Sequence, residues 1–165
     1  SMSLIKTDAI QTLAGKPILN STGSLLQVVT APFSTQVTTS STSFVTLGSP
    51  AIQGTITPSS TSSKIIIRFI TSIYTNSSAH SCYITLYRGT VASGTHLGQS
   101  TEGLGRAWNS SDQAMQNMAF EVVDEPSTTS AQIYQVGFRT DNAATAKYFM
   151  LSNTPAQLVL MEIAA

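Results

Sequence analysis

One segment, Ser100 to Ala114, gathers much of the polar chemistry in a chain that is otherwise poor in charge. It brings together two carboxylates, a guanidinium, an indole and an amide, from Glu102, Arg106, Trp108, Asn109 and Asp112. Sugar-binding sites use an exposed aromatic face with Asn, Asp and Arg side chains that hydrogen-bond hydroxyl pairs. Arg106, Trp108, Asn109 and Asp112 are therefore candidate glycan contacts. The competing interpretation makes Trp108 a buried core or interface residue, the commoner role of a lone tryptophan in a small β domain.

Catalytic patterns are weak throughout the chain. A glycosidase needs two carboxylates about 5–10 Å apart across the sugar bond, and Glu102 and Asp112, with Trp108 between them, are the nearest approach to such a pair. The chain has no nucleophile elbow, Gly-rich phosphate loop or His-x-x-x-His pair. His80 and His96 stand sixteen residues apart, and Cys82 is the single cysteine. We predict a non-enzymatic protein with no catalytic residue, no metal and no cofactor.

The charge content argues against two classes of partner. Only 10% of the 165 residues are charged, and eight basic and eight acidic side chains cancel to a formal net charge of +0. Nucleic-acid binding requires a clustered basic surplus to neutralise phosphates, so we expect no nucleic-acid partner. No stretch approaches the roughly 18 apolar residues of a membrane span, so we expect no membrane insertion. Ser1-Met2 looks like the scar of a cleaved tag.

The residue pattern after the first 27 positions indicates an all-β domain. Ser and Thr account for 47 residues, and β-branched and aromatic residues recur in clusters with a period near two. Turn-forming clusters separate the candidate strands, which is typical of a β-sandwich or barrel. The predicted strands are Gln27–Ala31, Thr35–Val37, Phe44–Ile52, Gly54–Thr57, Lys64–Thr75, His80–Arg88, Ala114–Val123, Gln132–Thr140, Lys147–Leu151 and Gln157–Ile163.

Some of these strands are too apolar for a solitary sandwich. The run Lys64–Tyr74 has Arg68 as its only interior charge, and Leu158–Ile163 has only Glu162. A strand that is apolar on both faces is covered on both sides, and a neighbouring subunit can supply the second cover. Tyr83 and Tyr87 share one face of their strand, as Tyr134 and Phe138 do of theirs. These four aromatic residues are candidate subunit contacts.

Residues 1–27 differ from the rest and form a predicted N-terminal arm, partly extended and partly helical. Helical spacing holds only from about Thr7 to Leu13, and Gly15 and Pro17 end it. An arm this thin cannot bury its apolar residues against itself, so it lies on the main domain or, as we favour, on copies of itself. Its candidate contacts are Ile10, Leu13, Ile18, Leu19, Leu25 and Leu26.

Several blocks of the sequence resemble bacteriophage virion proteins, especially tail-fibre-like ones. The blocks are Ile5-Lys-Thr-Asp-Ala-Ile10, Gly15-Lys-Pro-Ile-Leu-Asn20, Gly23-Ser-Leu-Leu-Gln-Val28, Asp124-Glu-Pro-Ser-Thr-Thr-Ser130, Ile133-Tyr-Gln-Val136 and Leu160-Met-Glu-Ile163. The resemblance covers residues 3–28 and 124–163, whereas residues 50–115 match only in strand rhythm. No one of these framework patterns is diagnostic alone.

The resemblance implies a fold, an assembly and a role. The fold is a jelly-roll β-sandwich head of about ten strands over residues 28–165, similar to the trimeric tumour-necrosis-factor and complement C1q heads. The assembly is a homotrimer, joined to other virion proteins through the arm. The role is attachment to host surface polysaccharide, or decoration of the particle, in a virion. Two alternatives remain open: a polysaccharide-cleaving spike domain, and a C1q-like or TNF-like binding module of cellular origin.

Overall fold

The computed structural model describes residues 22–46, 48–75, 80–108, 110, 114–143, 147–150 and 154–165. These residues form β-strands and no helix. The strands are β1 (Leu25–Phe33), β2 (Val37–Thr39), β3 (Val45–Thr46), β4 (Gln53–Ile56), β5 (Lys64–Thr75), β6 (Ser81–Arg88), β7 (Thr95–His96), β8 (Gly105–Trp108), β9 (Ala114–Asp124), β10 (Gln132–Thr140), β11 (Lys147–Phe149) and β12 (Ala156–Ile163).

Strand pairing follows one nested pattern. β1 pairs with β12, β4 with β10, β5 with β9 and β6 with β8, always antiparallel. Each pair lies inside the previous one along the sequence, so the chain is one long hairpin folded over on itself. Two sheets result, with the main strands in the orders β1-β12-β5-β9 and β4-β10-β6-β8. This eight-strand arrangement is a jelly roll, and the predicted all-β jelly-roll sandwich is confirmed.

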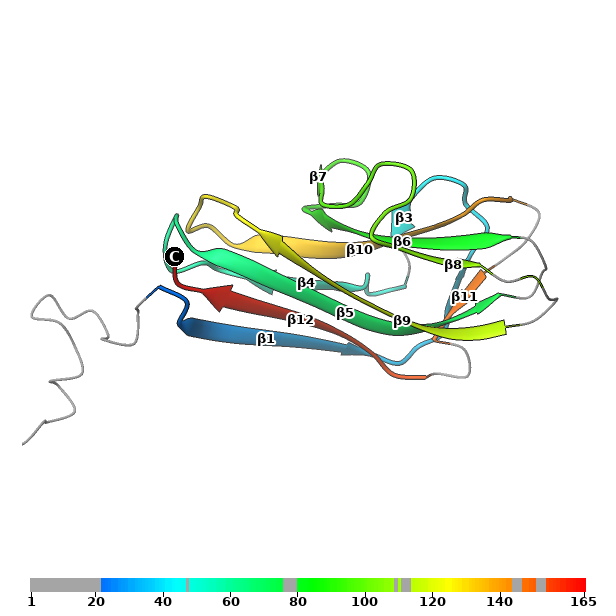
Figure 1. Cartoon of the computed structure of the whole chain (residues 1–165), viewed down its shortest axis with the longest axis horizontal. Helices are drawn as coiled ribbons and strands as arrows, with labels where there is room; N and C mark the ends of the chain where they lie inside the picture. Colours follow the sequence, from blue (N-terminus) through cyan, green and yellow to red (C-terminus); the bar gives the residue numbers. More distant parts are fainter. Residues whose placement is uncertain are drawn as a thin grey trace, which may run out of the picture.

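The two sheets lie face to face as layers (Figure 1). The first sheet contains β1, β12, β5 and β9, and the short β11 and β2 continue it beside the far end of β5. The second sheet contains β4, β10, β6 and β8, with β3 and β7 at its edges. The C-terminus lies beside the beginning of β1, where Gly23 N donates to the Ala164 carbonyl at 2.7 Å.

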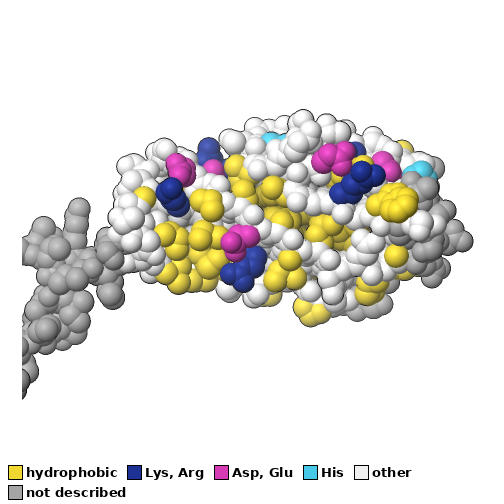
Figure 2. Space-filling view, in the orientation of Figure 1, with side chains coloured by type: hydrophobic (Ala, Val, Ile, Leu, Met, Phe, Trp, Pro, Cys, Tyr) yellow, Lys and Arg dark blue, Asp and Glu magenta, His cyan; other side chains and the backbone are white. Residues whose placement is uncertain are grey.

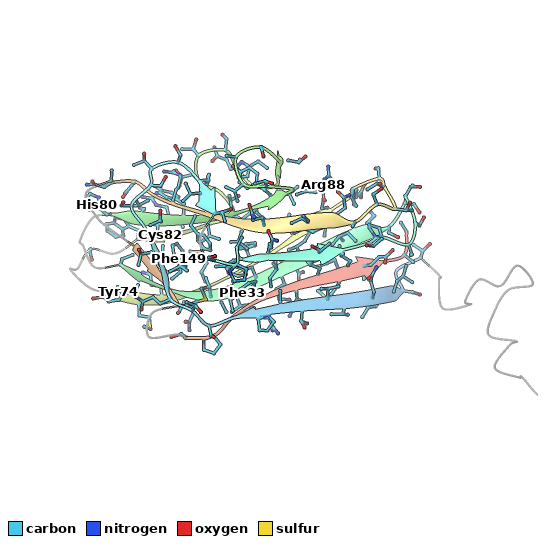
Figure 3. The ribbon with its side chains drawn as sticks, turned by 180° about the vertical axis from the view of Figure 1, so that it is seen from behind. Phe33, Tyr74, His80, Cys82, Arg88 and Phe149 are labelled. Carbon is cyan, nitrogen blue, oxygen red and sulfur yellow. The ribbon has the colours of Figure 1, made fainter. Side chains whose placement is uncertain are left out.

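The core fills the space between the sheets. Alternate residues of β5 point inward, and Ile65, Ile67 and Phe69 are fully buried. From the second sheet, Tyr134 and Phe138 meet them; the Phe69 and Phe138 rings lie edge to face with centroids 6.4 Å apart. Figure 3 shows Phe149 in this layer, with His80 and Arg88 marking the opposite ends of β6. Aromatic packing of this kind stabilises the contact beyond the area it buries.

The sequence prediction placed most strands correctly and failed in two regions. The bounds of β5 and β10 are those predicted. β7 and β8 were missed, because the segment from residue 89 to 108 contains five glycines and its strands are only two and four residues long. Of the strand predicted for Phe44–Ile52 only β3 is observed, since a turn containing Gly48, whose φ is +88°, follows it; the next strand, β4, corresponds to the one predicted for Gly54–Thr57.

The segment between β6 and β8 covers the outer face of the second sheet. It is held to β6 by hydrogen bonds from Leu97 N to the Leu86 carbonyl (2.9 Å) and from Leu104 N to the Ile84 carbonyl (2.8 Å). Gly103, with a φ of +70°, lies so close to β6 that a Cβ there would collide with the Ile84 carbonyl oxygen. Beneath the segment is a small second core, formed by Phe44, Tyr83, Tyr87 and Val91.

This covering corrects part of the expected subunit interface. Tyr83 and Tyr87 do share one face of β6, but the chain's own segment buries them to 5% and 8% exposure. Tyr134 and Phe138 lie on the opposite face of β10 and are fully buried in the main core. The prediction that these aromatic residues provide contact area for a second chain is therefore wrong, because a single chain already buries them.

The outer face of the first sheet has no such cover among the described residues. Its exposed apolar side chains are Val28, Ile70, Met115 and Val123, each 45–54% accessible, with half-buried Ile66, Val159, Met161 and Ile163 between them. Figure 2 shows apolar side chains gathered over β12, β5 and β9, interrupted by a charged pair. The predicted apolar character of Lys64–Tyr74 on both faces is thus confirmed, with one face in the core and one open.

Two polar clusters stabilise the end of the sandwich at which β1 begins. In the first, Asp124 of β9 accepts hydrogen bonds from Arg88 Nη1 (2.9 and 3.0 Å) and from the Tyr134 hydroxyl (2.7 Å). Burial, followed by the hydrogen bond to Asp124, raises the pKa of Tyr134, so this phenol stays protonated. Because Arg88 and Tyr134 belong to the second sheet, the cluster ties the two sheets to each other.

In the second cluster, the carboxylate of Glu162 is fully buried on β12. Its Oε1 accepts bonds from Ser59 N (2.6 Å), Ser59 Oγ (2.7 Å) and Ser63 Oγ (2.7 Å), and its Oε2 accepts one from Gln27 Nε2 (2.5 Å). Burial alone would raise the pKa of Glu162, but the hydrogen bonds from Ser63, Gln27 and Ser59 outweigh it and hold that pKa below its usual value. One charge therefore joins β1, β12 and the turn before β5.

We expect Glu162→Gln to lower the free energy of unfolding by about 1.5–3 kcal/mol, the usual contribution of hydrogen bonds to a charged group. A carboxyl with a lowered pKa stabilises the fold above its unfolded pKa, and this contribution is lost as pH falls through the folded one. The difference between wild type and variant should therefore shrink below about pH 4.5. Urea denaturation followed by far-UV circular dichroism at several pH values measures both effects.

Glu125→Gln is the matched control. Glu125 is exposed at the same end of the molecule, and its Oε1 lies 2.9 Å from Lys64 Nζ. Exposed ion pairs contribute about 0–1 kcal/mol, so this variant should unfold nearly like wild type. Equal losses in the two variants would contradict the role assigned to Glu162.

Candidate binding site on the second sheet

Arg106 and Trp108, two of the candidate glycan contacts, lie on β8. This strand pairs with the first half of β6, so that Arg106 stands opposite Tyr83 and Trp108 opposite Ser81. Ala107, between them, points into the core and is fully buried. Arg106 and Trp108 therefore share the outer face of the second sheet. Asn109 and Asp112, the other two candidates, lie outside the described residues.

Trp108 is 49% exposed, so the interpretation of it as a core residue is wrong. Its backbone carbonyl accepts a hydrogen bond from Gln116 Nε2 (2.8 Å), which fixes the end of β8 against β9. The indole itself is left as an apolar surface at the end of a rigid strand. Such a surface can stack on a sugar ring or pack against another protein.

The Arg106 guanidinium is oriented by three neighbours. Its Nε donates to Ser81 Oγ (2.9 Å), its Nη1 lies 3.7 Å from Glu102 Oε2, and its central carbon lies 5.5 Å from the centre of the Tyr83 ring. Both Arg106 and Glu102 remain about half exposed. Of the carboxylate pair considered for sugar cleavage, Glu102 is thus engaged by Arg106, while Asp112 lies outside the described part of the chain.

Tyr83 lies between two guanidinium groups. On the side away from Arg106, the central carbon of Arg139 lies 3.8 Å from the centre of the Tyr83 ring and 5.4 Å from that of Phe44. Arg139 is on β10, directly opposite Tyr83 in the ladder. The outer face of the second sheet therefore carries a continuous row of cation–π contacts, Arg106–Tyr83–Arg139.

Sequence reasoning missed Arg139, although a signal for it was present. The alternation that puts Phe138 in the core puts Arg139 on the outer face, with Gln135 and Gly137. The pattern could not predict that residues 89–104 fold over this face and leave Arg139 only 9% exposed. Arg139 is thus a buried charge at a position that the sequence alone marks as a surface residue.

The neighbouring titratable groups have structural roles. Asp141 Oδ2 accepts a hydrogen bond from Ser81 N (2.8 Å), and its Oδ1 lies 3.4 Å from His80 Nδ1. His96 is stacked on Tyr87 with ring centroids 4.5 Å apart, and burial lowers its pKa, which keeps it neutral near pH 7. Among the residues that the structure describes, no three His, Cys, Asp or Glu side chains gather as metal ligands would.

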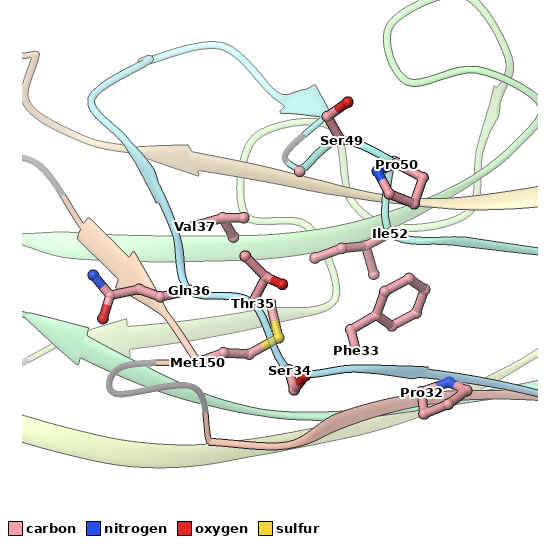
Figure 4. A pocket seen from close by; sticks show the side chains of 11 residues that line it. Pro32, Phe33, Ser34, Thr35, Gln36, Val37, Ser49, Pro50, Ile52 and Met150 are labelled. Atoms are coloured by element: carbon pink, nitrogen blue, oxygen red, sulfur yellow. The ribbon is translucent and has the colours of Figure 1, made fainter.

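Away from the surface at Arg106 and Trp108, a hollow lies between the end of β1 and the turn before β4 (Figure 4). It has a volume of about 440 Å³, and Phe33, Val37, Pro50, Ile52 and Met150 form much of its wall. The described residues that line it include no charged side chain. Ser34, Thr35, Gln36 and Ser49 also line it, so this hollow combines apolar surface with a few neutral polar groups.

No helix in the described part of the chain is long and apolar enough to cross a membrane. No protein-family profile and no curated protein matches the sequence.

Solved structures of viral particles are weakly similar to the chain. The VP2 subviral particle of infectious bursal disease virus is 15% identical, with a TM-score of 0.44, over 84% of this chain and 37% of that one. The T=1 particles derived from infectious bursal virus are 14% identical, with a TM-score of 0.45, over 84% of this chain and 36% of that one. This chain thus spans less than two-fifths of their length. Similarity at this level assigns neither a family nor a function.

The exposure of Trp108 predicts a small effect of its removal on stability. We expect Trp108→Ala to change the free energy of unfolding by less than about 1 kcal/mol, as is usual for surface substitutions. Phe138→Ala, in the core, should lower it by about 3–5 kcal/mol. Urea denaturation followed by far-UV circular dichroism compares the two variants; a loss for Trp108→Ala as large as that for Phe138→Ala would show that the indole is buried in solution.

Proposed function

We propose that this chain is a non-enzymatic structural protein of a bacteriophage virion. In this proposal three copies form a jelly-roll head that attaches the particle to glycans on the host surface. Residues 1–27 join the head to other virion proteins. The observation that carries the assembly is the open apolar face of the first sheet, whereas the phage setting and the number three come from the sequence resemblance.

The outer face of the first sheet is better suited to a copy of the same chain than to water. Covering a Val, Ile or Met side chain completely is worth about 1.5–3 kcal/mol, and Val28, Ile70, Met115 and Val123 are each about half exposed. Contiguous apolar patches of this kind mark interaction sites on soluble proteins. Placing the face against sister chains would remove it from contact with water.

The charges on this face favour a neutral partner. Arg68 Nε lies 3.3 Å from Glu121 Oε2, and Lys64 Nζ lies 2.9 Å from Glu125 Oε1. Each of these two cations thus has its own counter-ion, on β9 or directly after it. A net-neutral apolar surface fits the chain itself, whose formal net charge is +0. A strongly charged partner would find no complementary charge here.

The arm begins beside the same face. The described chain starts at residue 22 and enters β1, an edge strand of the first sheet, where Leu25 is 55% exposed and Leu26 is half-buried. Both were predicted arm contacts. The other four, Ile10, Leu13, Ile18 and Leu19, lie outside the described residues. Sister arms gathered at this end would extend the assembly beyond the sheets.

We expect the chain to have three times its mass of 17.4 kDa in solution, as measured by light scattering at micromolar concentration. Ile70→Lys should dissociate the trimer, because it places an unpaired charge in the centre of the apolar face. Ile133→Lys is the matched control, since Ile133 is also an exposed β-strand isoleucine, at 42%, but lies on the second sheet.

A monomeric wild type would contradict the proposed assembly. So would equal effects of the two lysine variants, which would indicate that the apolar face of the first sheet has no special role. A protein that lacks residues 1–21 separates the arm from the face: if it stays trimeric, the sheets suffice, and if Ile70→Lys then still dissociates it, the face is the contact.

The second sheet supports the attachment role. Trp108 offers an exposed indole beside Arg106, whose position is fixed by Ser81 and Tyr83. Single sugar sites bind weakly, but three heads on one particle convert weak binding into avidity through their effective concentration. The recognition face lies on the second sheet and the assembly face on the first, so that binding does not compete with assembly.

Glycan arrays test the attachment role. We expect the wild-type head to bind a subset of bacterial surface glycans and Trp108→Ala to lose at least tenfold in signal at equal concentration, since stacking on the indole would be lost. Trp108→Phe, which keeps an aromatic face, should retain part of the signal. Equal signals from wild type and Trp108→Ala would remove Trp108 from any glycan site.

A further inference from the structure

A polar cavity of about 420 Å³ opens on the outer face of the second sheet. Its wall includes the aromatic rings of Phe44 and Tyr87, the hydroxyl-bearing Ser43, Ser100 and Thr101, and the guanidinium of Arg139. Small-molecule sites usually have roughly 300–1,000 Å³ and combine apolar walls with a few fixed polar groups. This cavity has both features, and its Arg139 contacts the same Tyr83 ring as Arg106 does.

Arg139 has an unusual environment for a buried charge. Its Nε donates to the Thr101 carbonyl at 2.9 Å, its Nη2 donates to the same carbonyl, and its Nη1 donates to the Thr140 carbonyl at 3.3 Å. These bonds use three of the five N–H donors of a guanidinium. No carboxylate of the described residues forms an ion pair with it. A buried cation without a counter-ion is costly, and the cost falls when an anion enters the cavity.

The guanidinium is also held in one orientation. The Tyr83 ring lies on it at 3.8 Å and the Phe44 ring lies 5.4 Å away, measured from the guanidinium carbon to each ring centre. The Thr101 carbonyl fixes one edge of the planar group. Because the planar guanidinium is already fixed before binding, it loses little conformational entropy when it pairs with a carboxylate, whose two oxygens match its geometry.

We propose that this cavity binds the carboxylate of an acidic sugar, with Arg139 as the residue that pairs with the carboxylate. Ser43, Ser100 and Thr101 carry hydroxyls for the sugar ring; these side-chain oxygens make no hydrogen bond to other described residues. Phe44 and Tyr87 supply apolar walls for its C–H faces. The inference extends the proposed function, on which it rests, by assigning the glycan class: an acidic host polysaccharide, bound from this cavity toward Arg106 and Trp108.

The lining favours a carboxylate over a phosphate. A single cation, Arg139, lines the cavity among the described residues, and Arg106 beyond Tyr83 already has Glu102 as a partner. One positive charge balances the single negative charge of a sugar acid, whereas a phosphate monoester carries −1.5 to −2 near pH 7. The several hydroxyls suit a ligand that has hydroxyls of its own.

Calorimetric titration of the whole chain tests the inference. The probes are glucuronate, galacturonate and N-acetylneuraminate as their methyl glycosides, each beside its uncharged counterpart: the glucoside, the galactoside and the methyl ester. We expect at least one acid to bind at millimolar concentration or below, at least tenfold more tightly than its counterpart. Arg139→Gln should remove this preference, and added salt should weaken the binding of the acid but not that of the neutral sugar.

Because Arg139→Gln alters a buried group, a second variant is used that blocks the cavity and leaves Arg139 unchanged. Ser43→Trp places a bulky ring in the wall at a residue whose hydroxyl has no partner among the described residues, and it should abolish acid binding. Ser40→Trp, three residues earlier and exposed outside the cavity, is the matched control and should bind like wild type. Urea denaturation verifies that all the variants fold.

Three results would overturn the inference: no acid binds at millimolar concentration, every acid binds no better than its neutral counterpart, or folded Ser43→Trp binds like Ser40→Trp. Inorganic phosphate that competes as well as the best sugar acid would replace the carboxylate assignment by a general anion site. If a neutral glycan binds in the array through Trp108 while the acids fail, the proposed attachment role survives and this inference fails. If the acids bind but the wild-type chain is a monomer, this inference survives and the proposed trimeric assembly fails.

Discussion

The pairing of the first described strand with the last is the contact on which the rest of the fold depends. Because every other pair lies inside the β1–β12 pair, this ladder closes the nested hairpin and brings both ends of the sandwich together. Hydrogen bonds from Gly23 and Ala164 extend it by one more step. Glu162 reinforces the closure from inside, since its buried carboxylate is the common acceptor for Gln27 of β1 and for the turn before β5. A buried charge is tolerated there because its hydrogen bonds replace those of water.

The outer faces of the two sheets differ in how far the chain itself covers them. The second sheet is covered by the segment after β6, and this cover creates a small second core with a buried guanidinium beside it. The first sheet receives no comparable cover from the described residues and keeps its outward Val, Ile and Met side chains. The covering segment lies between β6 and β8, at the centre of the nested hairpin, where both flanking strands belong to the second sheet.

The sequence predicted what depends on local alternation and missed what depends on the folded chain. The bounds of β5 and β10 follow from long runs of period two, as do the inward positions of Ile84 and Phe138. Alternation, however, says only that Tyr83 and Tyr87 share a face, and not whether a sister chain or the chain itself covers it. Of the candidate glycan contacts, Arg106 and Trp108 lie together on β8, but Arg139 joins them only through the β6–β10 ladder, across 56 residues of sequence.

Burial of Arg139 has a further consequence for how the second sheet could recognise a ligand. The same cover that protects the small second core excludes water from one side of the guanidinium, which strengthens any electrostatic contact made inside the cavity. Arg106, about half exposed, lies on the other side of Tyr83 and is screened by solvent. In the proposed site the two arginines on one tyrosine would thus differ: the buried Arg139 would give selectivity for charge, and the exposed Arg106, with Trp108, would give contact area. A chain with few charges can in this way place its electrostatic selectivity in a single buried group.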